Sequence, residues 1–522
     1  MTSNNVCKGL KFSDCELAIV RMAVDKAGEK IGRRVVNSED IIKIIKTVED
    51  FIQRKSLVCY GGTAINNILP QSEQFYNKDV ELPDYDFFSP NALEDAKELA
   101  DVYFNQGFTD VEAKSGQHHG TYKVYVNFIP VADITYLNKE IYAVIKKESI
   151  QVAGIRYAPP NFLRMSMYLE LSRPVGDTSR WEKVLKRLIL LNKHYPLEAK
   201  NCDKISFQRG MENTDKSEEI YNNVKNTFIN QGVVFFGGFA MSMYSQYMPQ
   251  KNKNKVNKLA DFDVLSNDPE TTAEIVKERL IDIGIKNVKI AKKLPVGEIV
   301  PLHYEIKVGN DTIAFVYKPI GCHSYNVINF HNQKVKIATI DTMLSFYLAF
   351  LYTDRPYYNI FIDRILCMSK FLFEVQQKNR LSQKGLLKRF SINCYGHQES
   401  LEEMRAAKAA KYKELKQTKN IQEYNEWFLN YTPSSGKGTQ EKSSDNPIKP
   451  INPIKKENPI KKENPIKKEN NKKKENNKKK ENNKKKPSHT KKPKYNTRTK
   501  KNMRELIYGR NAKNKSYKRQ HY

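Results

Sequence analysis

The stretch "CYGGTAINNILP" (residues 59–70) places two glycines and a threonine between an apolar run, "SLVCY", and a short helical pattern. A second stretch, "FFGGFAMSMYSQYMP" (235–249), repeats this design 176 positions later. The two glycine pairs are followed by "DYDFFS" (84–89) and "DFDVLS" (261–266), which are offset by 177 positions. One glycine pair could arise by chance, but two in matching surroundings indicate an internal duplication.

Both halves of the chain predict the same order of elements: a helix, a short apolar strand, the glycine turn, a strand with an Asp-x-Asp pattern, and further strands and helices. In the first half, "NSEDIIKIIKTVEDFIQRK" begins at a helix cap, and "GTYKVYVNFIPVADITYL" is rich in β-branched and aromatic residues. In the second half we expect helices over 217–231, 270–283 and 339–378. The sequence therefore predicts an α+β protein with two tandem modules, each a mixed sheet with helices.

The net charge of +30 is concentrated at the C-terminus. Residues 433–522 contribute 30 Lys and Arg against 8 Asp and Glu, which leaves a net charge of +8 on the preceding residues. Six-residue units such as "NPIKKE" and "NNKKKE" fill 446–487, and the repeat has no aromatic residue. Such a segment buries too little apolar surface to offset the entropy of ordering, so we expect 433–522 to be disordered. It is either a basic RNA-binding arm or the product of codon drift in an AT-rich genome.

The chain has seven cysteines, none in a Cys-x-x-Cys pair: Cys7, Cys15, Cys59, Cys202, Cys322, Cys367 and Cys394. Several lie in apolar runs, where a thiol packs as a small hydrophobe, so we expect free thiols in a reducing, intracellular compartment. The N-terminus has no signal-peptide core, and the longest apolar run, "MLSFYLAFLY" (343–352), is far shorter than the ~18 residues that span a bilayer. These features predict a soluble protein without a membrane partner.

The Asp-x-Asp pattern of the first half places Asp84 and Asp86 on one face of a strand, because strand side chains alternate between faces. Two-metal phosphoryl transfer needs a further acidic ligand. The segment "IPVADITYL" supplies Asp133 among apolar neighbours, where an acid is unusual. Four other acids fall in loop or helix patterns and are expected to be solvated: Asp79, Glu81, Asp95 and Asp110.

The glycine turn is suited to bind phosphate groups beside these carboxylates. Gly61 and Gly62 let the backbone approach a ligand closely. The helix that follows offers N–H groups and the positive end of its dipole to phosphates, together with the Thr63 hydroxyl. Asp84 and Asp86 are suited to hold divalent cations against the same phosphates. The sequence therefore predicts a triphosphate on the turn, with cations between it and the carboxylates.

This order of motifs resembles the DNA polymerase β-like nucleotidyltransferase superfamily. The motifs "GGTAINNILP", "LPDYDFF", "VADITYL", "GGFAMSMY" and "ADFDVLS" are similar to those of the poly(A) polymerase catalytic subunit of large cytoplasmic DNA viruses, of the poxvirus and giant-virus type, over roughly 35–380. The resemblance implies addition of adenylates to the 3′ end of mRNA from ATP, with two Mg²⁺ or Mn²⁺ ions. It also implies residue roles: the catalytic metal ligands are Asp84, Asp86 and Asp133, and the phosphate-binding residues are Gly61, Gly62 and Thr63.

The resemblance further implies partners and a location. The substrates would be ATP and an RNA 3′ end, with a separate viral processivity partner as in the poxvirus relatives. A doubled chain with a basic tail could instead form a homodimer or act alone. The location would be the viral factory in the host cytoplasm, with packaging in the virion as a second site. Two alternatives stay open: a nucleotidyltransferase with another NTP specificity, and an inactive RNA-binding or virion scaffold of the same fold.

The predicted organisation has five segments. They are an N-terminal helical region (1–55), a catalytic nucleotidyltransferase module with a helical extension (56–200), a second, degenerate module (217–380), a helical C-terminal region (381–432) and the disordered tail (433–522).

The second module departs from the catalytic pattern. An ungapped alignment of "TYKVYVNFIPVADITY" with "HYEIKVGNDTIAFVY" pairs Asp133 with Phe315, whose ring cannot bind a metal. A competing register pairs Asp133 with Asp311, in the turn-like "VGNDT". We favour the first register, so the second module is predicted to be a structural or RNA-guiding pseudo-domain despite Asp261 and Asp263.

Other polar residues give weaker signals. His118 and His119 lie in a turn pattern, "SGQHHGTY", without zinc-ligand spacing around them. Five basic residues follow the catalytic strands and are interpreted as a solvated helix face that could reach a triphosphate or RNA: Arg164, Arg173, Arg180, Lys183 and Lys186.

Overall fold

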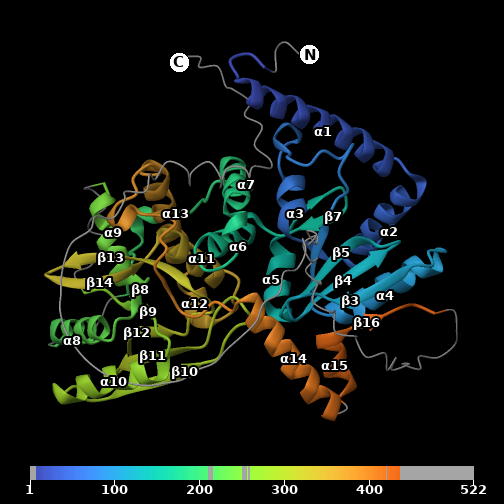
Figure 1. The fold of residues 1–522 in the computed structure, drawn as a ribbon. Coiled ribbons are helices and arrows are strands. Elements are labelled where there is room, and N and C mark those ends of the chain that lie inside the picture. The colour runs from blue at the N-terminus through green and yellow to red at the C-terminus, as the bar shows by residue number, and fades with distance from the viewer. Residues whose placement is uncertain (1–6, 210–215, 250–255, 257–258, 419, 435–522) are drawn as a thin grey trace, which may run out of the picture. The chain divides into compact units, whose positions relative to one another are not determined.

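Two eight-stranded mixed sheets organise the part of the chain that the computed structural model describes (Figure 1). The described residues are 7–209, 216–249, 256, 259–418 and 420–434. They belong to one unit, 1–438. The predicted disordered tail lies outside the described residues from position 435 onward. Because both sheets fall in one unit, the boundaries proposed for the five segments stay a prediction.

The first sheet has the strand order β16-β3-β4-β5-β2-β1-β7-β6. Its strands are β1 (Val58–Cys59), β2 (Tyr85–Ser89), β3 (Val111–Ser115), β4 (Thr121–Val126), β5 (Ile129–Tyr136), β6 (Ile150–Val152), β7 (Ile155–Tyr157) and β16 (Asn430–Tyr431). Strand β2 pairs antiparallel with β1 and parallel with β5, and β1 pairs parallel with β7.

The second sheet repeats this plan, with the order β10-β11-β12-β9-β8-β14-β13-β15. Its strands are β8 (Val234–Phe235), β9 (Phe262–Leu265), β10 (Val288–Lys293), β11 (His303–Val308), β12 (Asp311–Tyr317), β13 (His323–Phe330), β14 (Gln333–Ala338) and β15 (Cys394–Tyr395). Strand β9 pairs antiparallel with β8 and parallel with β12, and β8 pairs parallel with β14. Seven strands of each sheet thus follow the same order, and each sheet has one further edge strand, β16 beside β3 and β15 beside β13. This agreement confirms the predicted duplication and the α+β class.

Helices flank both sheets in matching order. They are α1 (Phe12–Val36), α2 (Glu39–Lys55), α3 (Gly61–Ile68), α4 (Ala92–Asn105), α5 (Lys139–Glu148), α6 (Pro160–Leu171), α7 (Trp181–His194), α8 (Ser217–Asn230), α9 (Gly238–Tyr244), α10 (Pro269–Asp282), α11 (Ile340–Phe350), α12 (Pro356–Asn359), α13 (Ile362–Lys378), α14 (Leu401–Thr418) and α15 (Ile421–Phe428). The predicted cap of α2 is confirmed, because the Ser38 hydroxyl accepts a hydrogen bond from the Ile41 N–H at 3.3 Å.

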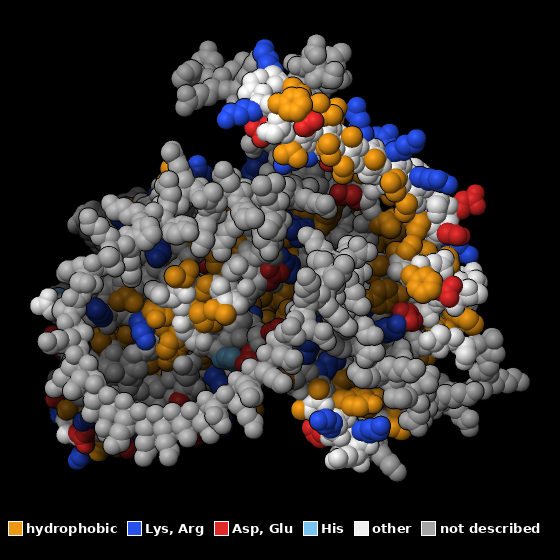
Figure 2. Space-filling model, in the orientation of Figure 1, with side chains coloured by type: hydrophobic (Ala, Val, Ile, Leu, Met, Phe, Trp, Pro, Cys, Tyr) orange, Lys and Arg blue, Asp and Glu red, His pale blue; other side chains and the backbone are white. Residues whose placement is uncertain are grey.

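Helix α1 buries none of its side chains. Its apolar residues lie on the surface, including Phe12, Val24 and Ile31, which are 79 %, 63 % and 64 % exposed (Figure 2). Among the described residues, no helix combines the length and the apolar character needed to cross a membrane.

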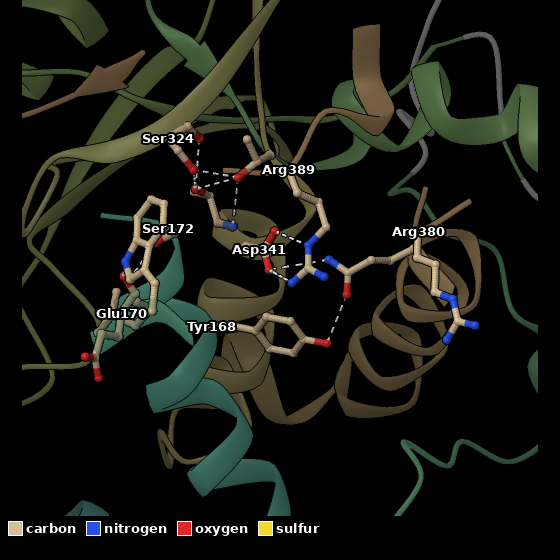
Figure 3. Close-up of polar contacts among 12 residues, drawn as sticks. Tyr168, Glu170, Ser172, Ser324, Asp341, Arg380 and Arg389 are labelled. Carbon is tan, nitrogen blue, oxygen red and sulfur yellow. Dashed lines mark hydrogen bonds and ion pairs between the residues drawn. The ribbon is translucent and has the colours of Figure 1, made fainter. Parts of the chain in front are cut away.

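A buried polar network joins α6 to α11 and α13 (Figure 3). Asp341, at the start of α11, accepts hydrogen bonds from Arg389 Nε at 3.0 Å and from Gln376 Nε2 at 3.4 Å. Tyr168, on α6, donates to Gln376 Oε1 at 3.4 Å. Helices α6 and α11 hold corresponding places in the duplication, each after the last parallel strand of its module, and the network fixes them against each other.

Six of the seven cysteines form disulfides, so the prediction of free thiols is wrong. The pairs are Cys7–Cys15, Cys202–Cys367 and Cys322–Cys394, and Cys59 is a buried free thiol. The paired residues are separated by up to 165 positions, a distance over which the sequence gives no pairing signal. Disulfides favour an oxidising compartment, so the cysteines no longer support a reducing location.

The C-terminal region contains more than helices. The predicted helical segment includes α14 and α15, but two short strands flank them. Strand β15 pairs with β13, at the edge of the second sheet, and β16 pairs with β3, at the edge of the first. This segment therefore contributes one strand to each module.

Candidate active site

The register of the first sheet brings the three predicted carboxylates together. On the parallel pair β2–β5, Asp86 lies opposite Asp133. Asp84 comes two residues before Asp86 and therefore shares its face. The proximity has an electrostatic consequence: desolvation and the neighbouring Asp84 and Asp133 carboxylates raise the pKa of Asp86 to about 7. Desolvation and the charge of Asp133 also raise the pKa of Asp84.

This carboxylate cluster has the oxygen donors that Mg²⁺ and Mn²⁺ prefer. Within the described ranges, no three Asp, Glu, His or Cys side chains stand close enough to hold a metal ion as they lie. The Asp133 carboxylate instead pairs with the Nζ of Lys123, which lies opposite it on β4. The mutual repulsion of three acids is the condition that a bound cation relieves, so the donor set fits a metal that takes the place of the ammonium group.

The glycine turn lies directly against the carboxylates. Gly61 has φ +72°, and a Cβ at this position would lie 2.6 Å from Asp86 Oδ2. A Cβ at Gly62 would lie 2.4 Å from Tyr76 Oη and 2.8 Å from Arg187 Nη2. The positive φ of Gly61 strains any other residue there, a side chain at Gly62 would displace Tyr76 or Arg187, and the first N–H groups of α3 start beside Asp86.

Thr63 makes a contact that the sequence did not show. Its hydroxyl donates to the Asp84 carbonyl at 2.6 Å, and the residue is only 4 % exposed. The hydroxyl therefore helps to hold the strand that carries Asp84, and a phosphate contact by Thr63 stays a prediction.

Helix α7 and the residue before it supply basic groups at the turn. Desolvation raises the pKa of Asp84 and of Asp86, and the positive charges of Lys183 and Arg180, respectively, offset part of this rise. Arg187, one turn after Lys183, donates from Nη2 to Tyr76 Oη at 2.6 Å.

The other three basic residues named from the sequence lie elsewhere. Arg164 is buried and donates to Asn192 Oδ1 at 2.7 Å. Lys186 pairs with Glu182 at 2.6 Å, and Arg173 points to the Ile320 carbonyl at 3.5 Å.

Two other polar residues named from the sequence, His119 and Asp95, make contacts within the protein. His119 packs against Trp427 of α15, with ring centres 4.2 Å apart and the ring planes inclined by 41°. Asp95 was expected to be solvated, but it is 4 % exposed and pairs with Ser89 and Lys55. A helix position alone could not show this, because the partners come from another helix and from β2.

The second module confirms the predicted register. On the parallel pair β9–β12, Asp263 lies opposite Phe315, as Asp86 lies opposite Asp133 in the first module. Asp311 is four residues away, at the start of β12, so the competing register is wrong. Here a phenyl ring stands where the first module has its third carboxylate.

Comparison with known proteins finds a family match in the region of the first module. Residues 46–177 match the family model described as poly(A) polymerase catalytic subunit, and this range contains all six predicted site residues. A protein of Acanthamoeba polyphaga mimivirus that carries the same description is 28% identical over 260 residues, which cover 46% of this chain and 42% of the relative. A counterpart from African swine fever virus is 32% identical over 171 residues, 32% of this chain and 36% of the relative.

The predicted resemblance to viral poly(A) polymerase catalytic subunits is confirmed. The matched region spans less than half the length of these two curated relatives. A crystal structure of the Megavirus polyadenylate synthase matches with a TM-score of 0.67 and 22% identity, covering 81% of this chain and 86% of that one. This likeness shows that the chain shares the fold of that polyadenylate synthase.

Sequence reasoning missed three charged residues at these sites. Lys123 could have been found, because alternation on β4 and the antiparallel β4–β5 hairpin place it opposite Asp133. Arg187 follows Lys183 by one helical turn, a spacing that puts both on one face. Arg209 could not have been found, because it lies 52 positions before Asp261, the carboxylate that it contacts.

Proposed function

We propose that this chain is a template-independent polynucleotide adenylyltransferase that extends the 3′ end of mRNA from ATP. The observation that supports it is the convergence of Asp84, Asp86 and Asp133 with the Gly61–Gly62 turn, inside the segment that matches the poly(A) polymerase family model. In the reaction, the RNA 3′ oxygen forms a bond to the α-phosphorus of ATP, the bond to pyrophosphate breaks, and the hydroxyl proton passes to solvent.

Each part of the site has a task in this proposal. The three carboxylates would hold two Mg²⁺ or Mn²⁺ ions, which when bound activate the attacking hydroxyl and neutralise the leaving group. The backbone N–H groups that begin α3 orient the triphosphate. Lys183 and Arg187, on α7, offset its negative charge beside the turn.

The decisive test is primer extension. The purified full chain receives a short RNA primer and each NTP singly, first with Mg²⁺ and then with Mn²⁺, beside Asp84→Ala/Asp86→Ala as the control. A ladder with ATP alone supports the proposal. A ladder with another NTP indicates a different base specificity, and no ladder with any NTP indicates the inactive scaffold.

The partners and the location belong to the same proposal. We expect the chain to bind ATP and RNA, and to act either as a homodimer or with a separate processivity subunit. Light scattering of the chain alone tests for the homodimer, and processive extension by a monomer would show that it acts alone. The proposed location is the viral factory in the host cytoplasm, with packaging in the virion as a second site. Alkylation of the protein from infected cells would show whether the disulfides exist there.

A further inference from the structure

Arg209, in the segment between α7 and α8, lies at the carboxylates of the second module. Its Nε contacts Asp261 Oδ2 at 2.6 Å, and its Nη2 contacts Asp263 Oδ1 at 3.3 Å. Its guanidinium carbon lies 4.7 Å from the centre of the Phe315 ring. One cation therefore touches the three side chains that correspond to Asp84, Asp86 and Asp133.

The glycine turn of this module also lies directly against its own carboxylates. A Cβ at Gly237 would lie 1.9 Å from Asp263 Oδ2, and one at Gly238 would lie 2.0 Å from Asp261 Oδ1. Gln208, the neighbour of Arg209, is 2 % exposed and donates from Nε2 to the Gly238 carbonyl at 3.0 Å. Two carboxylate oxygens therefore face the turn, and the other two face the guanidinium.

The segment that carries Arg209 is fastened to the second module at two further points. Cys202 forms a disulfide with Cys367 on α13, and the Phe207 ring lies 5.8 Å from that of Phe371, on the same helix. Arg209 is thus held in place by its neighbours as well as by its ion pairs.

The charges explain why a cation is needed here. Two carboxylates that share a mostly buried site repel each other and require a positive partner. A guanidinium is permanently charged and forms directed hydrogen bonds to carboxylates. Burial lowers the pKa of Arg209, but the charges of Asp261 and Asp263 more than offset this, so its pKa is raised.

We propose that Arg209 is a built-in cation that takes the place of a divalent metal in the second module and closes this module to nucleotide. The segment between the modules is then an internal ligand of the second site. It follows that removal of the guanidinium exposes a divalent-cation site on Asp261 and Asp263. This inference is independent of the proposed activity of the first module.

The test counts Mn²⁺ bound to the full chain, by the electron paramagnetic resonance signal of free Mn²⁺. The background is Asp84→Asn/Asp86→Asn/Asp133→Asn, which removes the ligands of the first module. We expect this background to bind no Mn²⁺ at the second module. Adding Arg209→Gln should create one site per chain and make the unfolding temperature rise with Mn²⁺. Arg209→Lys, which keeps a positive charge, is the matched control and should create none.

Several results would overturn the proposal. One is a folded Arg209→Gln chain that binds no Mn²⁺. Another is a background chain that already binds Mn²⁺ and loses it on Asp261→Asn. If Arg209→Gln does not fold, the uncharged combination Arg209→Met/Asp261→Asn/Asp263→Asn tests whether Arg209 balances the charge of the two carboxylates. It should fold, because it leaves no unpaired charge, and its failure to fold would show that charge balance is not the role of Arg209.

Discussion

The two modules share one backbone plan but solve the same electrostatic problem differently. In the first, Lys123 lies opposite Asp133 and makes a single ion pair with it, with 36% of the lysine side chain exposed. In the second, the corresponding cross-strand pair is Glu305 and Phe315, and the positive charge comes from Arg209, whose side chain is 17% exposed.

The difference teaches which site can exchange its cation. A partly exposed lysine with one carboxylate partner can leave at little cost, because such pairs contribute about 1 kcal/mol or less. A guanidinium that contacts two buried carboxylates and a phenyl ring cannot leave without stranding buried charge. We therefore expect the first site to accept metal and nucleotide and the second to exclude them. The five predictions that follow test this contrast.

The largest effect is expected at the carboxylates of the first module. Asp84→Ala, Asp86→Ala and Asp133→Ala should each lower the rate of adenylate addition by at least about a thousandfold, since each removes a metal ligand. The double variant Asp84→Ala/Asp86→Ala should be little worse than either single one, because the ligands act as a unit. Single-turnover extension measures the rates, and circular dichroism checks the fold. Substantial activity in the double variant would remove these residues from the active site.

The corresponding change in the second module should affect stability instead of rate. Asp261→Ala/Asp263→Ala should keep extension within a few-fold of the parent but lower the free energy of unfolding by about 3 kcal/mol, because Arg209 loses both partners. Urea unfolding and primer extension give the two quantities. Asp282→Ala, at a carboxylate that is 64% exposed, is the matched control. If turnover collapses in a folded variant, the second module is catalytic and the contrast fails.

Acid should weaken the second module through two buried histidines. Burial lowers the pKa of His303 to about 4 and, together with the charge of Arg173, that of His323 to about 3. The unfolded chain binds protons at these imidazoles below about pH 6.5, whereas the folded chain does not, so stability falls as the pH falls from about 6.5 toward 4. The expected loss is about 1 kcal/mol per histidine at pH 5.5. Unfolding of His323→Leu should depend less on pH over this range than unfolding of the parent, and an equal dependence would contradict the assignment.

A smaller effect is expected at Lys123. Lys123→Met removes the cation that competes for Asp133, so the Mn²⁺ concentration at half-maximal binding should fall roughly fivefold, the equivalent of about 1 kcal/mol. Lys114→Met is the matched control, because Lys114 lies opposite Lys123 on β3 but pairs with Glu112. Equal shifts in the two variants would mean that general charge, and not the Asp133 pair, is responsible.

The smallest effect on chemistry is expected from the tail. Deleting 433–522 should leave the folded body and its turnover intact at low salt, because the hexad repeat lacks apolar residues for a core. Any loss of RNA affinity should diminish as salt rises, since lysine–phosphate contacts act by counterion release. Loss of all turnover at low salt would place the tail within the fold.

The duplication and the carboxylate geometry could be predicted from the sequence. Strand alternation put Asp84 and Asp86 on one face, and an ungapped comparison of the two halves correctly placed Phe315 at the position of Asp133. These inferences rest on local periodicity and on the repetition of one pattern, both of which are visible along the chain.

Contacts between distant segments could not be predicted. Arg209 reaches its carboxylates across 52 positions, and Cys202 pairs with Cys367 across 165. Strand β16 is two residues long and has no alternation to detect, although it adds an edge to the first sheet. The hydrogen bond from Thr63 to the Asp84 carbonyl could not be predicted either, because no residue type reveals a backbone partner.

The position of β16 also fixes where the basic tail is attached. Tyr431 lies opposite Ala113 at the edge of the catalytic sheet, four residues before position 435. A covalent attachment at this edge sets an effective concentration for whatever the tail binds. An RNA that lysines of the tail capture would therefore be tethered to the first module, so that release from the tail and re-engagement of the 3′ end become steps within one complex. If the chain extends RNA as proposed, such tethering would change how many adenylates are added per encounter, a quantity that RNA affinity alone does not describe.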